Sequence, residues 1–72
     1  YDVAIAAGKR ALELNPGQYQ AATAVAMAYA ALGDDGEKQK YFDMAVKAGQ
    51  DAKLLERACS QYALRGQAEA QA

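Results

Sequence analysis

The chain has 72 residues, of which 53% are hydrophobic, but 19 of the apolar residues are alanine. A chain of this length forms one small domain, which leaves too little core for a large enclosed active site. Eight Lys and Arg against nine Asp and Glu, well mixed, give a net charge of −1, which argues against a nucleic-acid partner.

Glycine and proline divide the chain into segments of helical length. Within each segment, apolar side chains recur every three or four residues, which is typical of amphipathic helices. Most remaining positions hold strong helix formers such as Ala, Lys, Gln and Glu. Four helices are therefore predicted, and the breaks that end them, in chain order, are Asn15-Pro16-Gly17, Gly33 to Gly36, Gly49 to Asp51, and Gly66.

The predicted helix ends carry capping residues. Asp34, followed by Glu37, predicts a capping box at the start of the third helix, and Asp51 is expected to cap the fourth. The connections are two to four residues long, so neighbouring helices should run antiparallel. Left-handed residues are expected to end the helices at Asn15, Gly33, Gly49 and Gly66.

The sequence also repeats itself. Ala11-Leu12-Glu13-Leu14 recurs as Ala45-Val46-Lys47-Ala48 at an offset of 34, and Tyr29 and Gly33 recur as Tyr62 and Gly66 at an offset of 33. A period of this length that contains two antiparallel helices is the signature of a helical solenoid.

These residues resemble the tetratricopeptide repeat family, whose repeat pairs a helix A with a helix B. In a complete central unit, the matching residues are Ala22, Val25, Ala26, Tyr29, Gly33, Phe42 and Ala45. A preceding helix B supplies Ala4, Gly8, Ala11 and Pro16, and a following helix A supplies Leu55, Ala58, Cys59, Tyr62 and Gly66.

Three residues depart from the family pattern. Lys38 replaces a small alanine where helices A and B cross, so its ammonium group would have to stay in water above buried methylenes. Gln50 replaces a proline, and Gly8 replaces an aromatic residue.

The resemblance implies an all-α fold of antiparallel helix-turn-helix repeats in a short right-handed α-solenoid, with four helices and a short C-terminal segment. Residues 1–72 would form one domain: a helix B over 1–15, a complete repeat over 18–50, and over 52–72 a helix A with a partial helix or tail. We expect the chain to be an excerpt of a longer solenoid, with Tyr1, Ile5 and Leu12 exposed where a neighbouring helix is missing.

Little in the sequence points to catalysis. Without histidine, Ser-His, Cys-His and His-metal arrangements cannot form within these residues. Cys59 lies on an apolar helical stripe and is expected to be a core residue. The acidic run around Asp34 fits helix capping better than a calcium loop. We therefore predict no enzyme activity, no cofactor and no metal site.

The longest apolar run, Ala24 to Leu32, is far shorter than the ~20 residues that span a bilayer, so no membrane span is expected. The first residues do not have the basic-then-apolar pattern of a signal peptide, so we expect none within this segment. A single cysteine cannot form an internal disulfide, which slightly favours a cytoplasmic location and leaves a periplasmic one open.

The family resemblance implies a protein-interaction module that binds a peptide or protein on the concave face of its A helices. Lys53 and Arg57 lie four residues apart, as in a carboxylate clamp, but Ala24 replaces a clamp asparagine, so we interpret the pair as a solvated face. Two alternatives remain open: an accessory domain of a longer enzyme or sensor, and self-association through exposed repeat ends. The candidate groove residues are Gln20, Thr23, Met27, Ala30, Lys53, Glu56, Arg57, Ser60 and Leu64.

Overall fold

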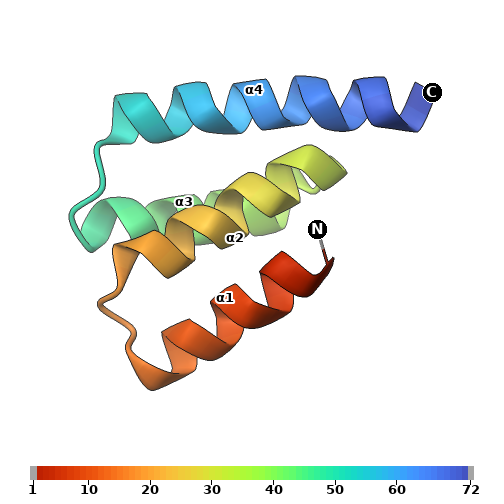
Figure 1. Cartoon of the computed structure of the whole chain (residues 1–72). Helices are drawn as coiled ribbons and strands as arrows, with labels where there is room; N and C mark the ends of the chain where they lie inside the picture. Colours follow the sequence, from red (N-terminus) through yellow and green to blue (C-terminus); the bar gives the residue numbers. More distant parts are fainter. Residues whose placement is uncertain (1, 72) are drawn as a thin grey trace.

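The structure, a computed structural model, describes residues 2–71, with side chains described up to Glu69. It contains four helices within this range and no strand: α1 (Asp2–Leu14), α2 (Tyr19–Leu32), α3 (Asp35–Lys47) and α4 (Ala52–Gln71). Successive helices run antiparallel (Figure 1). The predicted all-α class and the number of helices are confirmed. None of the described helices has the length and apolar character needed to cross a membrane.

Helix α2 is the centre of the molecule, because it packs against each of the other three helices. The Cα atoms extend only 17 Å in the thinnest direction, so the fold has room for no more than two layers of helices. Alanines on several faces of α2 let its neighbours approach closely. The buried core is formed by Leu12, Ala21, Ala22, Val25, Ala26, Ala30, Tyr41, Ala45, Leu55 and Cys59.

The predicted aspartate caps are present, but the capping box of Asp34 and Glu37 is incomplete, because the Asp34 backbone N–H donates to the Tyr29 carbonyl oxygen (3.0 Å) and not to Glu37. The Asp34 carboxylate accepts a hydrogen bond from the Glu37 backbone N–H (3.3 Å) at the start of α3. The Asp51 carboxylate accepts two at the start of α4, from the N–H groups of Lys53 (2.9 Å) and Leu54 (3.1 Å). These bonds satisfy backbone donors that have no partner inside the helix.

The predicted left-handed ends are confirmed at Gly33 (φ 78°) and Gly49 (φ 122°). The prediction for Asn15 is wrong, since no described residue other than glycine has a positive φ. Asn15 instead forms a turn in which its side-chain oxygen accepts a hydrogen bond from the Gly17 N–H (3.3 Å). A local side-chain bond of this kind turns the chain without a left-handed residue.

Gln50 shows why a proline would not fit at this position. Its backbone N–H donates to the carbonyl oxygen of Ala45 (3.0 Å) and closes the C-terminal end of α3. Its side-chain amide donates to the Thr23 hydroxyl on α2 (3.3 Å). Proline has no N–H and could make neither bond.

The prediction that Gly66 ends the fourth helix is wrong, because α4 continues through it to Gln71. No separate C-terminal segment follows Gly66 within the described residues. A Cβ atom built on Gly66 would overlap the backbone carbonyl of Ala31 on α2. Gly66 therefore permits a close crossing of two helices instead of ending one.

Gly8 has the same role where α1 crosses α2. A Cβ atom at this position would overlap a methyl group of Val25 and lie 3.3 Å from the Ala21 carbonyl oxygen. The aromatic residue of the family pattern would have no space here.

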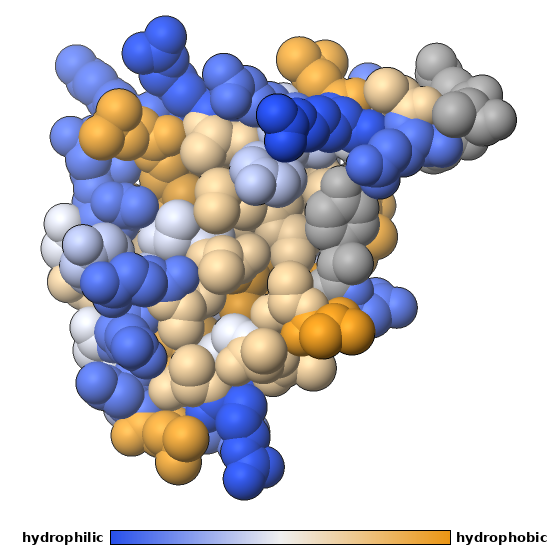
Figure 2. All heavy atoms as spheres, in the orientation of Figure 1, coloured by the Kyte–Doolittle hydropathy of each residue, from blue (hydrophilic) through white to orange (hydrophobic). Residues whose placement is uncertain are grey.

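The expectation that Ile5 and Leu12 are exposed is wrong, because both are buried, while Tyr1 lies outside the described residues. Ile5, Gly8 and Leu12 form the face that α1 turns toward α2. The exposed apolar residues at the ends of α1 are instead Val3 (82% exposed) and Leu14 (78%). Figure 2 shows a pale apolar surface across the middle of the face that α1, α2 and α4 share, with hydrophilic side chains along its left and upper edges.

Candidate functional site

A cleft of about 400 Å³ separates α3 from α4, with Ala30 of α2 at its base. Helix α3 forms one wall with Asp35, Lys38, Gln39 and Phe42. Helix α4 forms the other wall with Glu56, Cys59, Ser60 and Ala63. The cleft exists because α3 and α4 both pack mainly on α2 and barely touch each other.

This cleft continues along α4 into a second hollow of about 600 Å³. The two share Ala30, Asp35 and Ala63, and the second extends past Leu32 and Gly66 to Gln67 and Glu69. We call the combined feature the α4 groove. Its α4 wall runs from Glu56 to Glu69, a stretch of about 20 Å at a rise of ~1.5 Å per residue.

Carboxylates outnumber cations among the residues that line the α4 groove. Asp35, Glu56 and Glu69 carry negative charge, and Lys38 is the one cationic residue among those lining it. Phe42 and Leu32 supply apolar surface beside these charges. The groove therefore combines a mainly negative potential with apolar contacts.

Cys59 lies in the α4 wall of the groove and is buried, as the sequence predicts. Burial raises the pKa of its thiol, and the nearby Lys38 ammonium group opposes this shift. The thiol therefore stays protonated at neutral pH and is a weak nucleophile.

The structure brings three of the predicted groove residues together in the α4 groove, namely Ala30, Glu56 and Ser60. Thr23 instead accepts the hydrogen bond from Gln50, and Met27 packs against the core. The other four are exposed and do not line this groove: Gln20, Lys53, Arg57 and Leu64.

Sequence reasoning missed the contribution of α3. The family resemblance places the groove on the A helices, whereas Lys38, Gln39 and Phe42 come from what would be a helix B. Lys38 could have indicated this groove from the sequence. A lysine at a position where the family pattern has a small buried residue indicates that space open to solvent lies beside it. Its half-buried side chain lines the groove.

The described residues keep their polar and charged side chains at least partly accessible to solvent. No polar or charged side chain among them is buried, and no buried side-chain N or O atom lacks a hydrogen-bond partner. No group of three His, Cys, Asp or Glu side chains in this part of the chain is arranged to hold a metal ion. The α4 groove can therefore provide hydrogen bonds, charge and apolar surface at an open, wet site.

Comparisons of the chain with protein-family models, with characterised proteins and with solved structures give no match.

Proposed function

We propose that this chain is a non-catalytic protein-interaction module that binds an extended peptide segment of another protein in the α4 groove. The tetratricopeptide-like repeat pattern of the sequence supports a scaffold role of this kind. The observation that carries the proposal is the continuity of the groove along α4, from Glu56 to Glu69.

The length of the groove suits a peptide. An extended chain advances ~3.3 Å per residue, so the ~20 Å wall accommodates about six residues. Phe42 and Leu32 offer apolar contacts for alternate side chains of such a peptide. The carboxylates of Asp35 and Glu56 favour a peptide that carries Lys or Arg. The groove between α3 and α4 is open, so a bound peptide can extend beyond it at both ends. The groove can therefore bind a segment from within a longer partner chain.

The test is to select 12-residue peptides displayed on phage against the immobilised chain, and then to measure the affinity of labelled winners by fluorescence anisotropy. Ser60→Phe fills the groove from an exposed position on α4 and should weaken binding at least tenfold. Gln61→Phe adds the same ring at the neighbouring exposed position, which does not line the groove, and should leave the affinity within twofold.

Circular dichroism of both variants establishes that α4 remains helical. Peptides that bind Ser60→Phe as tightly as the parent chain would exclude the α4 groove as the binding site. A selection in which basic peptides are not enriched would refute the proposed charge preference.

A further inference from the structure

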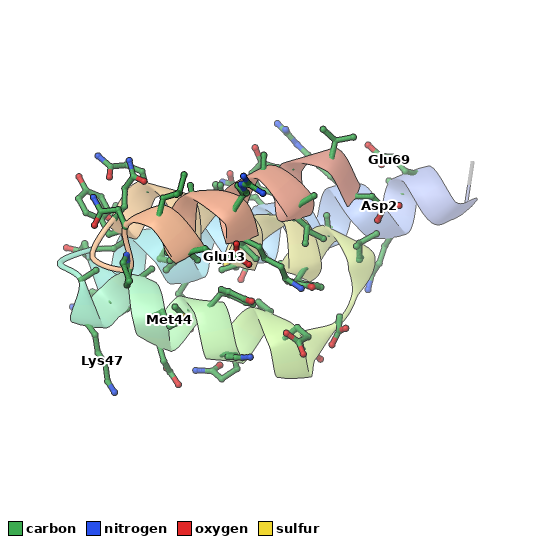
Figure 3. The ribbon with its side chains drawn as sticks, turned by 90° about the horizontal axis from the view of Figure 1, so that it is seen from below. Asp2, Glu13, Met44, Lys47 and Glu69 are labelled. Atoms are coloured by element: carbon green, nitrogen blue, oxygen red, sulfur yellow. The ribbon has the colours of Figure 1, made fainter. Side chains whose placement is uncertain are left out.

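A second groove, of about 300 Å³, lies between α1 and α3. Figure 3 views the molecule from the side on which these two helices lie next to each other, with Glu13 of α1 and Met44 of α3 labelled, while Lys47 extends away from α1. The groove is lined by Lys9, Leu12 and Glu13 of α1 and by Lys40, Tyr41 and Met44 of α3. We call it the α1–α3 groove.

Two lysine side chains lie over a stacked pair of tyrosine rings beside this groove. The rings of Tyr29 and Tyr41 have centroids 5.9 Å apart and planes inclined by 18°. The Lys9 ammonium nitrogen lies 5.3 Å from the Tyr29 centroid and 5.9 Å from that of Tyr41. The Lys40 nitrogen lies 5.6 Å from the Tyr41 centroid. The electron-rich ring of Tyr41 thus attracts an ammonium group from each wall of the groove.

Both ammonium groups are available to an anion. Neither forms a salt bridge with any residue that the structure describes. The interaction with the Tyr29 side chain raises the pKa of Lys9, which favours the charged form of its amine. Attraction to the aromatic rings does not neutralise these charges, so the groove presents two ammonium groups beside one lining carboxylate, that of Glu13.

We propose that the α1–α3 groove binds an acidic peptide segment in which carboxylates flank an apolar side chain. The two carboxylates pair with Lys9 and Lys40, one on each wall. The apolar side chain lies against Leu12 and Met44 on the floor between them. This site is separate from the α4 groove and has the opposite charge, so one chain can hold two partners of different composition.

The surrounding charges favour a peptide over a nucleic acid. Glu13 lines the groove, and the Glu37 carboxylate is near enough to affect Lys9. A nucleic acid carries a negative charge on every nucleotide, so its phosphates would be repelled by both carboxylates. A peptide can instead place its acidic side chains at the lysines alone. The apolar floor adds contact area that a phosphodiester cannot use.

The test uses three labelled ten-residue peptides in which leucine alternates with Glu, Gln or Lys, measured by fluorescence anisotropy with the 72-residue chain. The Glu peptide should bind most tightly and weaken as salt is raised. Lys9→Gln and Lys40→Gln should each weaken its binding by about two- to fivefold, as expected for exposed ion pairs. Arg10→Gln removes the same charge from the next residue of α1, which does not line the groove, and should leave binding unchanged.

The Gln variants retain an aliphatic stem, and circular dichroism checks that they remain helical. Equal binding of the Glu and Gln peptides would overturn the proposal, as would an Arg10→Gln effect as large as that of Lys9→Gln. Two further probes are measured with the same variants: vesicles that contain phosphatidylserine, and, separately, a single-stranded oligonucleotide. Lysine-dependent binding of either one, without binding of the Glu peptide, would also overturn it. Ser60→Phe leaves this site intact, so failure here and failure of the α4 groove are distinguishable.

Discussion

Gly66 of α4 lies directly against the backbone carbonyl of Ala31 in α2, at a separation that leaves no space for a Cβ atom. This contact sets how closely α4 approaches α2. It thereby fixes the position of one wall of the α4 groove, because Gly66 itself lines the groove. Gly66 therefore both permits the close crossing of α2 and α4 and helps to shape the proposed binding site.

Gly66→Ala should destabilise the chain. Alanine has a higher helix propensity than glycine, which would stabilise α4 by ~1 kcal/mol. The added methyl group would, however, overlap the Ala31 backbone, which cannot rotate away as a side chain can, and overpacking of this kind costs ~1 to 3 kcal/mol. A net loss of about 1 kcal/mol in the free energy of unfolding is expected, measured by urea denaturation.

Gly36→Ala is the matched control, because the nearest atom that a Cβ would meet is an Asp34 carboxylate oxygen at 3.9 Å. With open space around it, this change should raise stability by up to ~1 kcal/mol. If both substitutions stabilise the chain, α4 does not cross α2 at Gly66 as described.

Gly8 and Val25 should show energetic coupling. Gly8→Ala alone forces a methyl group against Val25, which is fully buried, and Val25→Ala alone leaves a cavity. In the double variant the new methyl group at residue 8 takes the place of the Val25 methyl group that it would otherwise overlap, so the double variant should be more stable than the sum of the single effects predicts. A double-mutant cycle measured by urea denaturation tests this, and additive effects would show that the two residues do not touch.

Local sequence signals predicted the helices and most of their ends, but not how closely the helices cross. Asp34, Asp51 and Gly33 act within one turn of the chain, so their roles follow from neighbouring residues. A glycine that ends a helix and a glycine that permits a crossing look alike in sequence, and only the distant partner, Ala31 for Gly66, distinguishes them. Ile5 was misjudged for a related reason, because its burial depends on how α1 rotates against α2.

The two aspartate caps should differ in strength. Asp51 accepts two backbone hydrogen bonds, of 2.9 and 3.1 Å, whereas Asp34 accepts one of 3.3 Å. Substitution of a capping aspartate by alanine usually costs ~0.5 to 2 kcal/mol. Asp51→Ala should fall in the upper half of that range and Asp34→Ala in the lower half, by thermal or urea unfolding. The reverse order would contradict the described cap geometry.

Cys59 should make the chain less stable at alkaline pH. Burial raises the pKa of its thiol in the folded state, so the folded chain holds this proton more tightly than the unfolded chain does. The buried thiol therefore makes its full contribution to the free energy of unfolding below pH ~8.5, the usual thiol pKa. This contribution is lost as the pH rises above that value. Urea unfolding from pH 7 to 10 should show a steeper decline for the parent chain than for Cys59→Ala. Parallel curves would mean that the thiol is not shielded from water.

The candidate site was harder to predict than the fold. Ala30, Glu56 and Ser60 were found because the repeat pattern assigns them to a shared face. Lys38 and Phe42 were missed, since the cleft between α3 and α4 depends on a separation that no local pattern encodes. The lysine–tyrosine arrangement of the α1–α3 groove depends on Tyr29 and Tyr41 from different helices and left no signal in the sequence spacing.

The most direct test of the central proposal is to map the peptide site by nuclear magnetic resonance, with a phage-selected peptide titrated into ¹⁵N-labelled chain. We expect the shifted amide signals to cluster at the α4 groove, at Ala30, Lys38, Phe42 and Ser60, and to saturate at one peptide per chain. Shifts confined to the outer surface of α4, at Lys53, Arg57 and Leu64, or no saturable shifts at all, would contradict it.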